Sequence, residues 1–296
     1  MEHYDACGEA MRERFPDSEM ICFELPSFGM SHSSCGSMEE LAQDLTGFIL
    51  KVRESYRGEL VLVMPCVSAL FCPVVLPSLP LHTVHRLVVL QCADYAGEKR
   101  WAEAVNARGM LSMPGARLLN YLKAKEISCR WYDTTFPSRG SYHECSGCSK
   151  EGLDVASGAR EARSWFSKVA SKAFDGGARF PLAWCLQRLF YAPRGSELVR
   201  LLREERKMIA VETLVLWGMQ DGSHRMNLPT LDEPSSTPSF ARYVSAPVRQ
   251  CCFSESAHFP ELQHPKRFAQ AVFHFLDSQG PEALDGSAID PPCSRL

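Results

Sequence analysis

Four short and almost wholly apolar segments constrain the fold of this chain more than any other feature. They span residues 59–64, 86–90, 212–217 and, less cleanly, 248–253. Strands of this kind are typical of a parallel sheet that carries helices on both faces, because neither face of such a sheet meets water. Helical patterns separate them, and one opens with a capping-box-like sequence at Ser37 and runs to about Tyr56. The sequence therefore predicts an α/β core with a mainly parallel sheet.

The strand pattern stops near residue 94, and helical patterns replace it up to residue 207. This change predicts an α/β core formed by residues 1–93 and 208–278, with an inserted helical cap at 94–207. Within the cap, the Ser- and Gly-rich segment 138–158 is predicted to be a flexible loop. The tail at 279–296 is predicted to be disordered, as chain ends often are.

The charge of the chain argues against nucleic acid as a partner. Its 32 basic and 35 acidic residues are scattered along 296 positions and form no basic stripe. No run approaches the roughly 18 consecutive apolar residues of a membrane span, so none is predicted. The 13 cysteines follow no signal peptide, which indicates reduced thiols and a cytoplasmic protein.

The sequence contains one cluster of potential metal ligands. Cys145, Cys148 and the nearby His143 resemble half of a zinc site, but no second pair completes four ligands. Their Ser- and Gly-rich surroundings favour a solvated loop. The sequence predicts no metal and no cofactor.

Cys66 stands at the end of an apolar strand, where a nucleophile elbow would place its nucleophile. Such an elbow needs small residues two positions to either side, and here Met64 and Ser68 occupy those positions. A buried cysteine after a strand is more often a packing residue than a nucleophile. Ser68 is an alternative nucleophile, although its place favours the role of a small elbow neighbour.

Two further residues follow later strands. Asp221 comes after an apolar strand and a Gly turn, at the carboxyl end where ligands gather in open parallel sheets. His258 follows the last strand and precedes the final helix. Taken singly, Asp221 reads equally well as a solvated turn residue, and His258 as a surface residue. Their order after Cys66 is the nucleophile, acid, base order of one large fold class.

With these segments in view, the chain resembles the α/β-hydrolase superfamily, in particular the branch with a helical cap. The similar segments are ELPSFGMS at 24–31, LVLVMPCVSAL at 60–70, TLVLWGMQD at 213–221 and AHFPELQHPKRFAQAVFHFL at 257–276. The resemblance implies that Cys66 attacks an acyl carbon, that His258 is the general base and that Asp221 orients it. It also implies that the backbone amide of Val67 serves the oxyanion hole. A Cys-His-Asp set occurs in the dienelactone-hydrolase-like members.

The sequence departs from the pattern of that superfamily in three ways. Met64 replaces an elbow glycine, and Pro73 falls inside the following helix, so a relaxed turn is expected. The first residues correspond to the helix before the fourth strand of the superfamily, which implies a truncated chain without three strands and one oxyanion-hole loop. A further strand predicted at 20–25 would then pair directly with 59–64, or leave unpaired backbone groups.

The sequence thus favours a hydrolase that cleaves an ester, thioester or related acyl bond of a small apolar substrate. Five residues are candidates for the substrate pocket: Phe28, Trp101, Trp184, His224 and Phe259. The aromatic residues are also plausible as cap core, and His224 as a turn residue. Two other hypotheses stay open: an inactive homologue that binds a ligand or protein partner, and Cys66 as a target of oxidation or modification.

Overall fold

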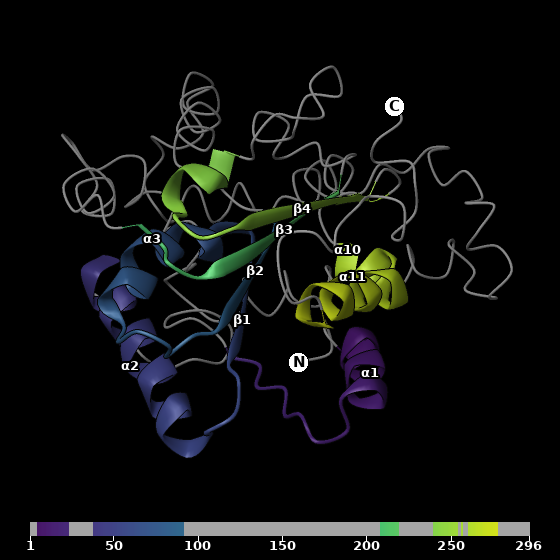
Figure 1. Cartoon of the computed structure of the whole chain (residues 1–296), viewed down its shortest axis with the longest axis horizontal. Helices are drawn as coiled ribbons and strands as arrows, with labels where there is room; N and C mark the ends of the chain where they lie inside the picture. Colours follow the sequence, from purple (N-terminus) through teal and green to yellow (C-terminus); the bar gives the residue numbers. More distant parts are fainter. Residues whose placement is uncertain are drawn as a thin grey trace, which may run out of the picture.

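The computed structural model describes residues 5–23, 38–91, 208–218, 239–253, 256 and 260–277. Within these residues, four parallel strands form one sheet in the order β1-β2-β3-β4 (Figure 1). The strands are β1 (Val61–Pro65), β2 (Arg86–Leu90), β3 (Glu212–Gly218) and β4 (Val248–Phe253). The four strands expected from the apolar segments are confirmed, with small shifts at the ends of β1 and β3.

The burial of the strands explains why they could be recognised. β2 and β3 lie in the middle of the sheet, and every residue after the first is buried in both. β1 alternates between buried and half-buried residues, as a strand with one well-covered face does. Continuous apolar runs therefore mark the central strands, whose two faces are both covered.

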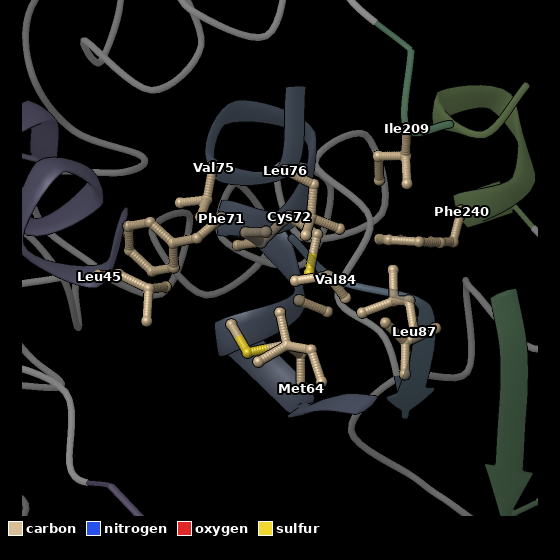
Figure 2. Close-up of a cluster of buried hydrophobic side chains, with 14 of the residues drawn as sticks. Leu45, Met64, Phe71, Cys72, Val75, Leu76, Val84, Leu87, Ile209 and Phe240 are labelled. Atoms are coloured by element: carbon tan, nitrogen blue, oxygen red, sulfur yellow. The ribbon is translucent and has the colours of Figure 1, made fainter. Parts of the chain in front are cut away.

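Helices cover one face of the sheet with a large apolar cluster. They are α2 (Met38–Ser55), the 3-10 helix η2 (Cys66–Phe71), α3 (Cys72–Val75), and the 3-10 helices η3 (Leu76–Ser78) and η5 (Ser239–Tyr243). Leu41, Leu45 and Ile49 of α2 share the spacing of one helix face and are buried in this cluster. Figure 2 shows residues of the same cluster from α2, β1, η2, α3 and β2 packed together. The helix predicted from Ser37 to about Tyr56 is confirmed as α2.

Helices from the first and the last described ranges of the chain cover the other face of the sheet. They are α1 (Asp5–Arg14), α10 (Pro260–Gln263) and α11 (Pro265–Asp277), which Figure 1 shows on the side of the sheet opposite α2. Phe268, Val272 and Phe275 recur on one face of α11 and are buried against β2, β3 and β4. Pro265 begins this helix, at a position where the amide that proline lacks would have no partner within the helix.

An ion-pair cluster ties the amino ends of three strands together. The Arg249 guanidinium lies 2.8 Å from a Glu212 carboxylate oxygen, and that of Arg86 lies 3.8 Å from the other oxygen. Both guanidinium groups also lie over the Phe275 ring, at 5.8 Å for Arg86 and 5.7 Å for Arg249. Arg86 donates a hydrogen bond to the Leu276 carbonyl. The strand starts are thereby joined to α11.

The strand predicted at 20–25 is wrong for residues 20–23, which have no regular structure. Met20 and Ile21 are exposed, while Phe23 packs against Phe48 of α2 with ring centroids 4.9 Å apart. A strand is stable only when its backbone joins a ladder, and an apolar composition alone does not supply one. Residues 24 and 25 lie outside the described part of the chain.

Several predicted regions also lie outside the described residues: the cap at 94–207 with its loop at 138–158, and the tail at 279–296. The division into core and cap therefore stays a prediction. None of the described helices is long and apolar enough to cross a membrane.

Candidate functional site

The carboxyl edge of the sheet brings the ends of β1, β2 and β3 side by side. Pro65 lies opposite Leu90, and Leu90 lies opposite Leu216. The next residues along the first two strands, Cys66 and Gln91, therefore follow adjacent strand ends. This edge is where open parallel sheets bind ligands.

Cys66 forms a sharp turn between strand and helix. Its φ angle is 51°, while Pro65 before it is extended, with φ −85° and ψ 148°. A positive φ is unusual for a residue other than glycine, and it is the kind of backbone that holds a side chain at the top of a nucleophile elbow. The expectation of a relaxed turn is thus wrong. The Cys66 side chain itself is half-buried.

Ser68 fastens this turn from the helix side. Its hydroxyl donates a hydrogen bond to the carbonyl of Pro65, the residue just before Cys66. The side chain is largely buried. The bond favours the interpretation of Ser68 as an elbow neighbour over its role as an alternative nucleophile, because the hydroxyl proton is committed to the backbone.

The two departures expected to disturb the elbow are accommodated. Met64 is only 1% exposed, because side chains alternate along β1 and Met64 points into the apolar cluster with Leu87 and Cys72 (Figure 2). Pro73 lies in the first turn of α3, because the helix behind the elbow is divided at Cys72. In a first turn the missing amide of proline costs no helical hydrogen bond.

Gln91 is a component of this edge that the sequence reasoning missed. It is 1% exposed and has a φ of 44°. Its backbone amide donates to the Leu216 carbonyl at 2.9 Å, and its side-chain amide donates to the Gly218 carbonyl at 3.1 Å. A polar residue directly after the apolar run RLVVL was the available signal.

The loop that contains His258 in the sequence begins and ends in fixed structure. The Ser256 side chain is fully buried, and its hydroxyl contacts the Gln263 Oε1 atom at 2.8 Å. The Ser256 amide donates to the Phe253 carbonyl at the end of β4, at 3.2 Å. At the other end, Pro260 is buried at the start of α10. Both flanks of His258 are therefore attached to the core.

The other predicted site residues are placed as follows. Val67 is the second residue of η2, directly after Cys66. The remaining ones lie outside the described residues: Phe28, Trp101, Trp184, Asp221, His224, His258 and Phe259. The described structure therefore brings together Cys66, Val67, Ser68 and Gln91 at one edge. The positions of the predicted acid and base relative to Cys66 stay predictions.

No protein-family model matches this sequence, and no curated protein matches it significantly. Solved structures do match. MenH from S. aureus aligns at 15% identity with a TM-score of 0.55, over 93% of this chain and 90% of MenH. The esterase EaEST from Exiguobacterium antarcticum aligns at 13% identity with a TM-score of 0.55, over 93% of this chain and 88% of the esterase. The Bacillus megaterium epoxide hydrolase aligns at 16% identity with a TM-score of 0.54, over 93% and 90%.

These likenesses and the observed parallel sheet show that the chain has the α/β-hydrolase fold. At 13–16% identity they establish the fold, and a fold hosts many activities. The expected absence of three strands is not confirmed, since the alignments extend over 88–90% of each neighbour.

Proposed function

We propose that this protein is a hydrolase that cleaves an ester, thioester or related acyl bond with Cys66 as its nucleophile. Asp221 and His258 complete the catalytic set, and the substrate is a small apolar acyl compound. The substrate lies between the core and the cap at 94–207, near Phe28, Trp101, Trp184, His224 and Phe259. No cofactor takes part in this reaction.

The observation that carries the proposal is the left-handed backbone of Cys66 at the carboxyl end of β1. Its φ of 51° and the Ser68 bond to the Pro65 carbonyl form a fastened turn. Holding a non-glycine residue in this conformation costs about 1–2 kcal/mol, and such cost is concentrated at functional sites. This backbone favours a functional role for Cys66 over a packing role.

The first half of the reaction forms a covalent acyl-enzyme. His258 takes the proton of the Cys66 thiol, and the Sγ atom attacks the acyl carbon to give a tetrahedral intermediate. The Val67 amide donates a hydrogen bond to the oxyanion. When the intermediate collapses, the bond to the leaving alcohol or thiol breaks, and that group takes the proton from His258.

The second half regenerates the enzyme. His258 takes a proton from water, whose oxygen attacks the thioester carbon on Cys66. The carbon–sulfur bond breaks, the carboxylic acid is released, and the thiol regains its proton from His258. Asp221 holds the imidazole in the correct tautomer and stabilises its charged form.

The rival function is a non-catalytic binding module, and the described structure removes two arguments for it. Met64 and Pro73 suggested a damaged elbow, yet Met64 is buried in the core and Pro73 lies in a first helical turn. The hypothesis of Cys66 as a modification target shares the half-buried Cys66 thiol with the proposal, and only turnover separates the two.

The test is turnover of chromogenic esters and thioesters by the purified protein, with the intact mass followed in parallel. We expect release of the chromophore with a transient mass increase equal to the acyl group. Cys66→Ala should abolish both, and His258→Ala should lower turnover at least about 10³-fold.

The matched control is Cys22→Ala, because Cys22 is an exposed cysteine that precedes the elbow in the sequence and is not part of it. This variant should retain the turnover of the wild type. Slow labelling spread over several cysteines, with no turnover, would reject the hydrolase and support the binding module.

A further inference from the structure

Gln91 stands at the point where two neighbouring strands stop pairing. β2 ends at Leu90, and β3 continues past the partner of Leu90, which is Leu216, to Gly218. In a parallel ladder, the carbonyls of residues 216 and 218 would both accept from amides of the neighbouring strand. The amide of Gln91 fills the first place, at 2.9 Å from the Leu216 oxygen.

The second place is filled by a side chain. Gln91 has a φ of 44°, which lies outside the range of strand residues. In a continuing parallel ladder, the Gly218 carbonyl would accept from the amide two residues after Gln91. The Gln91 side-chain amide donates to the Gly218 carbonyl at 3.1 Å. A single buried residue thus supplies two consecutive donors to β3.

This arrangement holds the last residue of β3. Gly218 is buried, and loss of a hydrogen bond to a buried carbonyl is costly and favours fraying of a strand end. Asp221 follows Gly218 by three residues in the sequence. Gln91 also follows the strand end beside that of Cys66, because Leu90 pairs with Pro65.

From this geometry we propose that Gln91 is a positioning residue, which sets the place of Asp221 by holding the Gly218 carbonyl at the end of β3. The proposal rests on the proposed function, because it gives Asp221 the role of the acid that orients His258. Gln91 itself contacts no reacting atom. Its effect reaches the reaction through Asp221 and His258.

The test replaces the amide donor without changing the size of the side chain. Gln91→Met keeps the length of glutamine and removes the donor. Gln91→Asn keeps the amide and tolerates a positive φ, but it is one methylene too short to reach the Gly218 oxygen at its present distance. If Gln91→Met does not fold, Gln91→Asn supplies the same loss of contact.

The decisive measurement is the NMR titration of the His258 imidazole, assigned by its loss in His258→Ala. Asp221→Asn serves as the reference, and it should lower the pH at which His258 titrates, because a nearby carboxylate stabilises the imidazolium. Both Gln91 variants should move the midpoint in the same direction by a smaller amount. Their kcat/KM should fall about 10- to 100-fold, mostly in kcat.

The matched control is Thr213→Val at the opposite end of β3. Thr213 is also fully buried, and its hydroxyl donates to the Val211 carbonyl at 2.8 Å. This variant loses one buried side-chain hydrogen bond on the same strand, so it reports general loosening. It should leave the His258 titration and kcat/KM within 2-fold of the wild type.

The outcomes distinguish the positioning role of Gln91 from the proposed triad. If Asp221→Asn lowers the His258 midpoint and the Gln91 variants leave it unchanged, the positioning role is overturned while the triad stands. If Asp221→Asn itself leaves His258 unchanged, the proposed triad fails, and the role of Gln91 fails with it. An equal shift in Thr213→Val would show that the effect is general loosening and would also overturn the proposal.

Discussion

At the scale of the residue, Cys66 adopts a left-handed backbone directly after β1. Its φ of 51° brings the Cβ atom close to the following carbonyl oxygen, a contact that glycine avoids. The Ser68 hydroxyl bond to the Pro65 carbonyl helps to hold this arrangement. The conformation therefore has a measurable cost that depends on the Cβ atom alone.

We expect Cys66→Gly to be more stable than Cys66→Ala by about 1 kcal/mol in urea unfolding, because glycine enters the left-handed region without a steric penalty. The control is the same exchange at the buried helical residue Ala69, where Ala69→Gly should lower the free energy of unfolding. Equal stabilities for the two Cys66 variants would contradict a left-handed turn at this position.

Gln91 and Ser256 show which residue-level features the sequence leaves hidden. The hydrogen bond from Gln91 to Gly218 joins residues 127 positions apart, so no local pattern announces it. The contact between Ser256 and Gln263 is local, yet a short polar loop predicts exposure, and Ser256 is fully buried. For both Gln91 and Ser256, the sequence offers one signal of these contacts, which is a polar residue close to the end of a strand.

At the scale of the element, the local sequence pattern predicts a strand correctly where both faces of the strand are buried. It fails where the strand would need a neighbouring strand to pair with. β2 and β3 are apolar throughout and were placed nearly to the residue. Residues 20–23 have the same composition but are not a strand, because strand formation requires a neighbouring edge that the segment does not itself encode. The effect of Pro73 also depends on more than its local pattern. The helix is divided at Cys72, so Pro73 lies in a first turn, where it is tolerated.

The ion-pair cluster at the strand starts gives a prediction at this scale. Arg249 is buried, and its guanidinium lies 2.8 Å from the Glu212 carboxylate. Glu212→Gln should lower the free energy of unfolding by about 2–4 kcal/mol, because it removes the carboxylate charge that lies against the buried guanidinium of Arg249. Thermal or urea unfolding measures this loss.

The matched control is the exposed pair of Arg14 and Asp277, with a similar separation of 2.9 Å. Arg14→Gln removes one charge from a solvated pair and should change stability by less than about 1 kcal/mol. Losses of the same size in both variants would mean that burial does not distinguish the two pairs.

At the scale of the whole molecule, α1 closes the second face of the sheet by packing on α11. Phe15 and Phe273 meet edge to face with centroids 5.3 Å apart, and Cys7 is buried in the cluster that contains Phe268 and Phe275. Burial, and then the nearby Glu261 carboxylate, raise the pKa of the Cys7 thiol to about 12. Cys7 is thus a natural reporter of the docking of α1.

We expect Cys7 to resist alkylation in the folded protein at pH 8 and to react once α1 is released by urea, because only the thiolate reacts and burial disfavours it. Cys22, which is exposed, should react in the folded state and serves as the positive control. Peptide mapping by mass spectrometry after timed labelling measures both rates. Comparable rates in the folded protein would contradict the docking of α1.

The same thiol makes stability depend on pH in a defined direction. Its pKa is higher in the folded than in the unfolded state, so its contribution to stability is complete below about pH 9 and declines as pH rises toward 12. Cys7→Ala should therefore flatten the loss of stability over this range. Urea unfolding at pH 8 and pH 10 measures the difference, and identical pH slopes for wild type and variant would refute it.

The pairing of α1 with α11 also has a consequence for how this protein is made. Arg14 and Asp277 are separated by 263 positions, and at roughly 5–20 residues per second a ribosome needs roughly 13–50 s to synthesise the chain between them. Throughout that interval α1 lacks the α11 residues on which it packs. The nascent chain therefore emerges with an early helix whose contacts with α11 form late, and the α1–α11 layer can close only when translation of α11 is complete.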